Sequence, residues 1–141
     1  MTVNHNYYLD LAFQIAEKNL GRTRLNPSVG TIIVKNDAVI SSAVTSYNGR
    51  PHSEFNALNN LKDCTGASLY TTLEPCTHYG KTPPCTNIII KKKIKNVYYA
   101  FEDPDFRTFK KAKKFLKQKG IKAKLIPTKK YSKFYQSYFI N

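Results

Sequence analysis

The stretch "TLEPCTHYGKTPPC" (residues 72–85) holds two of the chain's three cysteines, Cys76 and Cys85, each directly after a proline. A strand pattern, "GASLYTTL", leads into it, and a helix pattern with proline at its start, "PPCTNIIIKKKI", follows it. We therefore expect Cys76 on the loop that leaves a strand and Cys85 near the first turn of a helix. A strand joined to a helix in this way is the basic unit of an α/β domain.

The flanking sequence extends this alternation in both directions. Apolar positions predict an opening helix from about residue 4 to 20, and "VGTIIVKNDAVISSAV" predicts a hairpin that turns at Asn36 and Asp37. A helix begins near His52, "KNVYYAF" is a strand, and "FRTFKKAKKFLKQKG" is a helix capped by Gly120. The strand "IKAKLI" and a tyrosine-rich helix end the chain. The order predicts one mixed sheet covered by helices.

Length and composition limit the class of protein. The 141 residues fit one domain, and the 41% apolar residues and 18 aromatic residues (10 Tyr, 8 Phe) are typical of a folded globular chain. No stretch approaches the roughly 18 uninterrupted apolar residues of a membrane span. The N-terminus has neither a basic start nor a small-residue cleavage site, so we expect a cytoplasmic protein with reduced thiols.

The net charge of +14 raises the question of a nucleic acid partner. Most lysines lie in the last third of the chain, at polar helical positions between apolar ones. This spacing favours solvated helix faces. Attraction of a phosphorylated small molecule and binding of nucleic acid remain the two alternatives, with nucleic acid the less favoured.

Three residues in the sequence suit a borderline metal ion: His52, Cys76 and Cys85. Two of them fall near helix starts, which favour the thiolate form that binds a metal. Zinc is the natural occupant of one imidazole and two thiolates, and three protein ligands leave a fourth position for water. Zinc lowers the pKa of such a water to about 7. Glu54, two residues after His52, is placed to carry the proton.

Two other interpretations of the cysteines stay open. His78 could complete a closed structural site, although Cys76 and His78 would then ligate from one very short segment. A Cys76–Cys85 disulfide is disfavoured in a chain without an export signal. Cys64 has no partner in the pattern and is interpreted as an ordinary thiol, and His5 as a surface residue.

The motifs "HSE", "EPC" and "PPC" resemble the zinc deaminase signature, a histidine and glutamate followed by two cysteines. Eight residues separate the cysteines here, and this spacing resembles the deaminases of riboflavin biosynthesis. Those enzymes remove an amino group from a diaminopyrimidinone ribosylamine 5′-phosphate. The segments "NPSVGTIIVKNDAVI", "GRPHSEFNAL" and "IKNVYYAFEDPD" are similar to the same family, so the resemblance covers essentially the whole chain.

The resemblance implies a fold and a set of functional residues. It implies a cytidine-deaminase-like three-layer α/β/α sandwich formed by residues 1–141, a single deaminase domain without a reductase domain. It also implies one zinc ion on His52, Cys76 and Cys85, and Glu54 as the proton shuttle. The substrate contacts that it implies are Asn26, Ser53, His78 and Lys81.

The same resemblance implies partners: a phosphorylated pyrimidine substrate, a separate reductase in the same pathway, and further copies of the chain in a homo-oligomer. The chain departs from the family at two places near the substrate. Thr45 stands where the family commonly has a histidine, and "DPDFRTFKKAKK" has no glycine where the family is glycine-rich. A deaminase of a nucleic acid base and a non-catalytic zinc module are the competing hypotheses.

Overall fold

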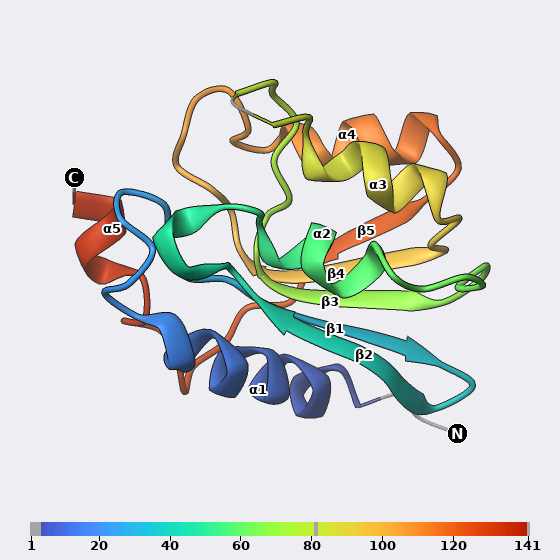
Figure 1. The fold of residues 1–141 in the computed structure, drawn as a ribbon, viewed down its shortest axis with the longest axis horizontal. Coiled ribbons are helices and arrows are strands. Elements are labelled where there is room, and N and C mark those ends of the chain that lie inside the picture. Colours follow the sequence, from blue (N-terminus) through green and yellow to red (C-terminus); the bar gives the residue numbers. More distant parts are fainter. Residues whose placement is uncertain (1–3, 81, 141) are drawn as a thin grey trace.

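The computed structural model describes residues 4–80 and 82–140, which form a five-stranded sheet with helices on both faces (Figure 1). The strand order is β2-β1-β3-β4-β5. β1 pairs antiparallel with both β2 and β3, whereas β3, β4 and β5 run parallel. The predicted mixed sheet in a three-layer α/β/α arrangement is confirmed.

The elements alternate as the sequence pattern predicted. The strands are β1 (Gly30–Lys35), β2 (Ala38–Val44), β3 (Ser68–Leu73), β4 (Asn96–Phe101) and β5 (Lys122–Leu125). The helices are α1 (His5–Ala16), α2 (Ser53–Leu58), α3 (Cys85–Lys91), α4 (Lys111–Gln118) and α5 (Gln136–Ile140), with short 3-10 turns at Glu17–Asn19 and Tyr47–Gly49. In the described part of the chain, none of these helices has the length and apolarity needed to cross a bilayer.

Each face of the sheet has its own apolar core. Helices α2, α3 and α4 cover one face, where Leu58, Ile89 and Leu116 are fully buried. Helix α1 and the C-terminal segment cover the other, where Phe13 stacks on Tyr131 with ring centroids 4.3 Å apart. The tyrosines of the C-terminal segment (residues 126–140) therefore pack on this sheet face.

His5 was expected at the surface, but it is half-buried. The centroid of its ring lies 4.1 Å from that of Tyr98.

The hairpin turn has the backbone conformation that its residues predict. Asn36 and Asp37 both have positive φ, 52° and 62°, as a two-residue type I′ turn requires. Asn and Asp tolerate this left-handed region better than other residues with a side chain. The prediction of a β1–β2 hairpin is confirmed.

Helix α4 begins later than predicted. The sequence pattern placed its start near Phe106, but residues 106–110 form turns and the helix starts at Lys111. Lys110 has a φ of +59°, which is incompatible with a continuous helix. The backbone N–H groups of Lys110 and Ala112 donate to the carboxylate of Glu74, and this buried anchor fixes where the helix begins.

The loops after β3 and β4 leave the same edge of the sheet, because neighbouring parallel strands end together. In open α/β sheets this edge is where ligands bind. The starts of α2 and α3 approach it from the side, which brings the candidate residues of both helices near these loops (Figure 1).

Gly30 offers a test of the contact between α1 and the sheet. A Cβ at this position would overlap the backbone carbonyl of Ala12, which no side-chain rotation relieves. We expect Gly30→Ala to reduce the free energy of unfolding by about 3 kcal/mol. For a domain of this size that corresponds to a fall in Tm of roughly 6–12 °C. Gly80→Ala is the control, since its Cβ would meet only Arg50 Nη2 at 3.5 Å. Equal Tm values for the two variants, measured by circular dichroism, would contradict the close approach.

Candidate metal centre

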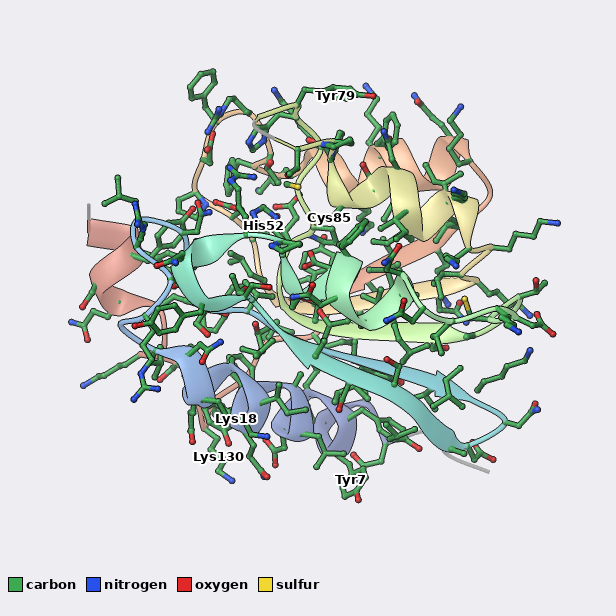
Figure 2. The ribbon with its side chains drawn as sticks, in the orientation of Figure 1. Tyr7, Lys18, His52, Tyr79, Cys85 and Lys130 are labelled. Atoms are coloured by element: carbon green, nitrogen blue, oxygen red, sulfur yellow. The ribbon has the colours of Figure 1, made fainter. Side chains whose placement is uncertain are left out.

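Three elements bring His52, Cys76 and Cys85 together. His52 is the residue before α2, Cys76 lies on the loop after β3, and Cys85 is the first residue of α3. Figure 2 shows the side chains of His52 and Cys85 meeting between the starts of their helices. Proline before Cys85 suits a helix start, because its ring fixes φ where no intrahelical N–H bond is needed.

The spacing of the donor atoms fits a single metal ion. His52 Nδ1 lies 3.4 Å from Cys85 Sγ and 3.8 Å from Cys76 Sγ, and the three donor atoms all lie within 4.8 Å of one another. Donors bound tetrahedrally at about 2.0–2.3 Å from an ion are separated by roughly 3.6 Å. The three residues could therefore hold a metal ion with only small adjustments.

The two thiols are electrostatically unequal. The hydrogen bond from Cys85, with help from His52, lowers the pKa of Cys76 to about 4. The backbone N–H of Cys85 also donates to Cys76 Sγ at 3.1 Å. The same pairing with Cys76, followed by burial, raises the pKa of Cys85 well above its usual value. Cys76 is thus preorganised as a thiolate, and Cys85 would lose its proton when a cation binds.

Glu54 lies beside this cluster and is 3% exposed. Burial raises the pKa of its carboxyl, while the charge of His52 opposes that shift. Ser53 donates a hydrogen bond to Glu54 Oε1 at 2.9 Å and is itself linked to Thr31 Oγ1 at 2.8 Å. The hydrogen bond from Ser53 therefore orients the carboxyl, which lines a cavity together with His52 and Cys76.

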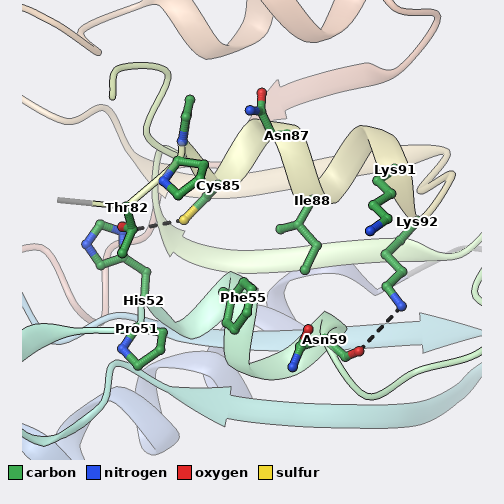
Figure 3. A pocket seen from close by; sticks show the side chains of 12 residues that line it. Pro51, His52, Phe55, Asn59, Thr82, Cys85, Asn87, Ile88, Lys91 and Lys92 are labelled. Atoms are coloured by element: carbon green, nitrogen blue, oxygen red, sulfur yellow. Dashed lines mark hydrogen bonds between the residues drawn. The ribbon is translucent and has the colours of Figure 1, made fainter. Parts of the chain in front are cut away.

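This cavity is small and polar, with a volume of about 80 Å³. It is lined by Asn26, Pro27, Val29, Thr45, Arg50, His52, Glu54, Leu73, Glu74, Cys76, His78, Asp103, Asp105, Arg107 and Tyr138. A larger, mostly apolar hollow of about 530 Å³ lies between α2 and α3 (Figure 3). His52 and Cys85 both line it, and of these two only His52 also lines the smaller cavity. Glu54 lines the smaller cavity and not the larger one, so its carboxyl is accessible to a molecule in the smaller one.

Of the four predicted substrate contacts, the structure places two in the lining of the small cavity. Asn26 and His78 line the cavity; Asn26 donates to Gly49 O at 3.0 Å, and His78 Nδ1 lies 3.0 Å from Thr108 Oγ1. The Ser53 hydroxyl points to Glu54 and into the core, so any contact with a substrate would come from its backbone. Lys81 lies outside the described residues.

Thr45 also lines the cavity, but its hydroxyl is occupied. It accepts the backbone N–H of Val29 at 2.9 Å and lies 3.4 Å from the carbonyl oxygens of Pro27 and Val29. The side chain is 1% exposed. Thr45 therefore shapes the pocket wall and orders its backbone.

Sequence reasoning did not single out Glu74 and Asp103, although both stand in quoted motifs. Glu74 precedes Pro75 of "EPC", and its Oε1 accepts the backbone N–H of Asp103 at 3.1 Å. Asp103 follows β4 and lines the cavity. Acidic residues before proline are common in turns, so the pattern carried no sign that these two carboxylates would be buried close to Cys76.

The comparisons with known proteins agree with this geometry. Residues 2–101 match the family model described as the cytidine and deoxycytidylate deaminase zinc-binding region. Riboflavin biosynthesis protein RibD of Bacillus amyloliquefaciens is 40% identical over 119 residues, which are 84% of this chain and 32% of that protein. The diaminohydroxyphosphoribosylamino-pyrimidine deaminase of Buchnera aphidicola subsp. Schizaphis graminum is 36% identical over 135 residues, 94% of this chain and 92% of that protein.

Solved structures show the same fold. RibD of Acinetobacter baumannii superposes with a TM-score of 0.90 at 34% identity, covering 96% of this chain and 39% of that one. The chain thus spans about a third of the length of the RibD relatives it matches.

A mixed sheet with a histidine and a cysteine at two helix starts, and a second cysteine on the loop after a strand, defines the cytidine-deaminase-like class of proteins. Within that class, the chain belongs to the cytidine and deoxycytidylate deaminase zinc-binding family. The resemblance inferred from "HSE", "EPC" and "PPC" is confirmed, and the riboflavin-biosynthesis deaminases are among its relatives.

Removing one donor tests the metal centre directly. Loss of an outer-shell partner of a metal ligand typically costs about 10–100-fold in affinity, so Cys85→Ser, which removes a candidate ligand itself, should cost more. We expect the purified variant to carry far less transition metal per chain than the wild type, measured by inductively coupled plasma mass spectrometry.

The matched control is Cys64→Ala, since Cys64 is buried elsewhere, 3.4 Å from Lys92 O. Full metal content in Cys85→Ser, with its melting temperature unchanged, would contradict the proposed ligand set.

Proposed function

We propose that this chain is a zinc-dependent deaminase of a phosphorylated diaminopyrimidinone, 2,5-diamino-6-(5-phosphoribosylamino)pyrimidin-4-one. The observation that carries the proposal is the carboxyl of Glu54 facing a small polar cavity beside a cluster of one histidine and two cysteines. Support for the substrate comes from the Buchnera relative, which is named as a deaminase of this compound class and matches over nearly its whole length.

His52, Cys76 and Cys85 would hold one zinc ion. One imidazole and two thiols are the donor types that zinc prefers, and three protein ligands leave a position open to solvent, as in catalytic sites. When bound, zinc acts as a Lewis acid that makes water a nucleophile at neutral pH.

Glu54 would carry the proton in this reaction. Water adds to the ring carbon that bears the amino group, the bond from that carbon to nitrogen breaks, and ammonia leaves. Glu54 accepts a proton from the attacking water and delivers it to the departing nitrogen, so it ends in its starting state. The hydrogen bond from Ser53 to Oε1 holds the carboxyl in one orientation through both transfers.

The size of the cavity suggests how the substrate lies. Ligand pockets that enclose a drug-sized molecule have volumes of about 300–1,000 Å³, far above that of this cavity. We propose that only the pyrimidine ring enters and that the phosphoribosyl tail lies across the rim. Arg50, His78 and Arg107 line the cavity, and Arg50 donates to Thr82 Oγ1 at 2.9 Å. Together with Lys81, a cation predicted from sequence, they would attract the phosphate.

A reductase would act next on the product. The Thermotoga maritima relative is named as both a deaminase and a uracil reductase, and it is 35% identical to this chain. We propose that a reductase of the same kind consumes the product of this chain.

The substrate is tested by incubating the zinc-loaded protein with the diaminopyrimidinone phosphate and measuring ammonia release. We expect turnover of this compound and none of single-stranded RNA or DNA under the same conditions. Deamination of a polynucleotide without turnover of the small molecule would replace the proposal with the nucleic acid hypothesis. Turnover of neither substrate by zinc-loaded protein would favour a non-catalytic zinc module.

Glu54→Gln tests the proton transfer. The amide keeps the size and the hydrogen bond from Ser53 but cannot take up a proton, so kcat should fall by at least about 10²–10⁴-fold. Zinc content should stay that of the wild type, because Glu54 is not among the ligands. A variant with bound zinc and full activity would rule out Glu54 as the proton carrier.

A further inference from the structure

The C-terminal segment reaches the pocket although it lies beyond residues 2–101, which match the family model. Tyr135 anchors it: the side chain is 3% exposed, and its hydroxyl donates to Ser28 O at 2.7 Å and lies 2.6 Å from Thr72 Oγ1. Ser28 and Thr72 belong to the segments that form the pocket end of the sheet, where Figure 1 places α5. Helix α5 is therefore fixed beside the cavity.

One turn further on, Tyr138 lines the cavity itself. Its ring is half-buried, and its hydroxyl donates a hydrogen bond to Asp103 Oδ1 at 3.0 Å. A phenol hydrogen bond to a carboxylate is charge-assisted and stronger than one between neutral groups. Tyr138 thus connects the last helix to the loop after β4.

Several hydrogen bonds fix the position of Asp103. Its Oδ1 accepts from Tyr138 and from the backbone N–H of Asp105 at 2.9 Å, and its own N–H donates to Glu74 Oε1 at 3.1 Å. Among residues 4–80 and 82–140, nothing hydrogen-bonds to Asp103 Oδ2. The residue is 8% exposed and lines the cavity, so this oxygen is an acceptor that a ligand can reach.

We propose that Tyr138 is a positioning residue that orients the Asp103 carboxylate to accept an N–H group of the aminopyrimidine ring. The inference rests on the proposed function and extends it, because it makes helix α5 part of the substrate site. An amino-substituted ring presents N–H donors, and a carboxylate oxygen fixed at one position is a suitable acceptor. Without the phenol hydroxyl, Oδ1 loses one of its two donors and the carboxylate can rotate away.

Tyr138→Phe removes only the hydroxyl and is the test variant. We expect its KM for the diaminopyrimidinone phosphate to rise about tenfold, with a smaller change in kcat. Tyr131→Phe is the matched control: it also removes one tyrosine hydroxyl from the C-terminal segment, but Tyr131 stacks on Phe13 and does not line the cavity. The control should leave KM unchanged.

A double-mutant cycle separates positioning from a merely structural role. Asp103→Asn should raise KM by itself, and adding Tyr138→Phe to it should raise KM little further, because the hydroxyl acts through that carboxylate. An unchanged KM in Tyr138→Phe, or effects that multiply fully in the double variant, would overturn the proposal.

Failure of the positioning role of Tyr138 can be distinguished from failure of the proposed function. If the wild type releases no ammonia from the diaminopyrimidinone phosphate, the proposed function is wrong, and the same cycle is run with deoxycytidine monophosphate. A raised KM for that aminopyrimidine in Tyr138→Phe, with the same non-additivity, supports the positioning role. An unchanged KM, or no turnover of either compound, overturns it.

Discussion

The hydrogen bonds that the buried carboxylate of Glu74 accepts hold together the segments that surround the cavity. It accepts backbone N–H groups from Asp103, Lys110 and Ala112, and it lies two residues before Cys76. A carboxylate 2% exposed would be costly without such donors. Burial raises its pKa, and the three backbone N–H groups oppose that rise. Through this one side chain the loop after β3, the loop after β4 and the start of α4 hold fixed relative positions.

The sheet topology explains why the chemistry gathers at this edge. Parallel β3 and β4 end together, so their loops face each other, and the starts of α2 and α3 add His52 and Cys85 from the side. Further links tie the two loops together: Thr77 Oγ1 donates to Arg107 O at 3.0 Å, and His78 meets Thr108. A rigid frame of this kind suits the proposed deamination, since small displacements of the reacting groups slow the chemistry.

The lysines that give the chain most of its positive charge and the charged residues that line the cavity lie on different surfaces. On α4, Ala112 and Leu116 face the core while the lysines of the helix are exposed, as a solvated amphipathic helix requires. The cavity is lined by four carboxylates, of which Glu74, Asp103 and Asp105 accept hydrogen bonds from backbone N–H groups, from Tyr138 or from Arg107. The interpretation of the lysine-rich segments as solvated faces agrees with the exposure of the lysines on α4.

Local patterns in the sequence determined the order of elements, the hairpin at Asn36 and Asp37, and the choice of His52, Cys76 and Cys85 as candidate metal ligands. These follow from periodicity, turn preference and the spacing of metal-binding side chains, which are properties of short segments. The tertiary structure alone decided that α4 starts at Lys111, that the Ser53 hydroxyl meets Thr31 in the core, and that Tyr138 meets Asp103 across 35 positions of sequence. Each of these depends on a hydrogen bond between groups brought together by the packed sheet, and no local pattern specifies which distant partner a buried polar group will find.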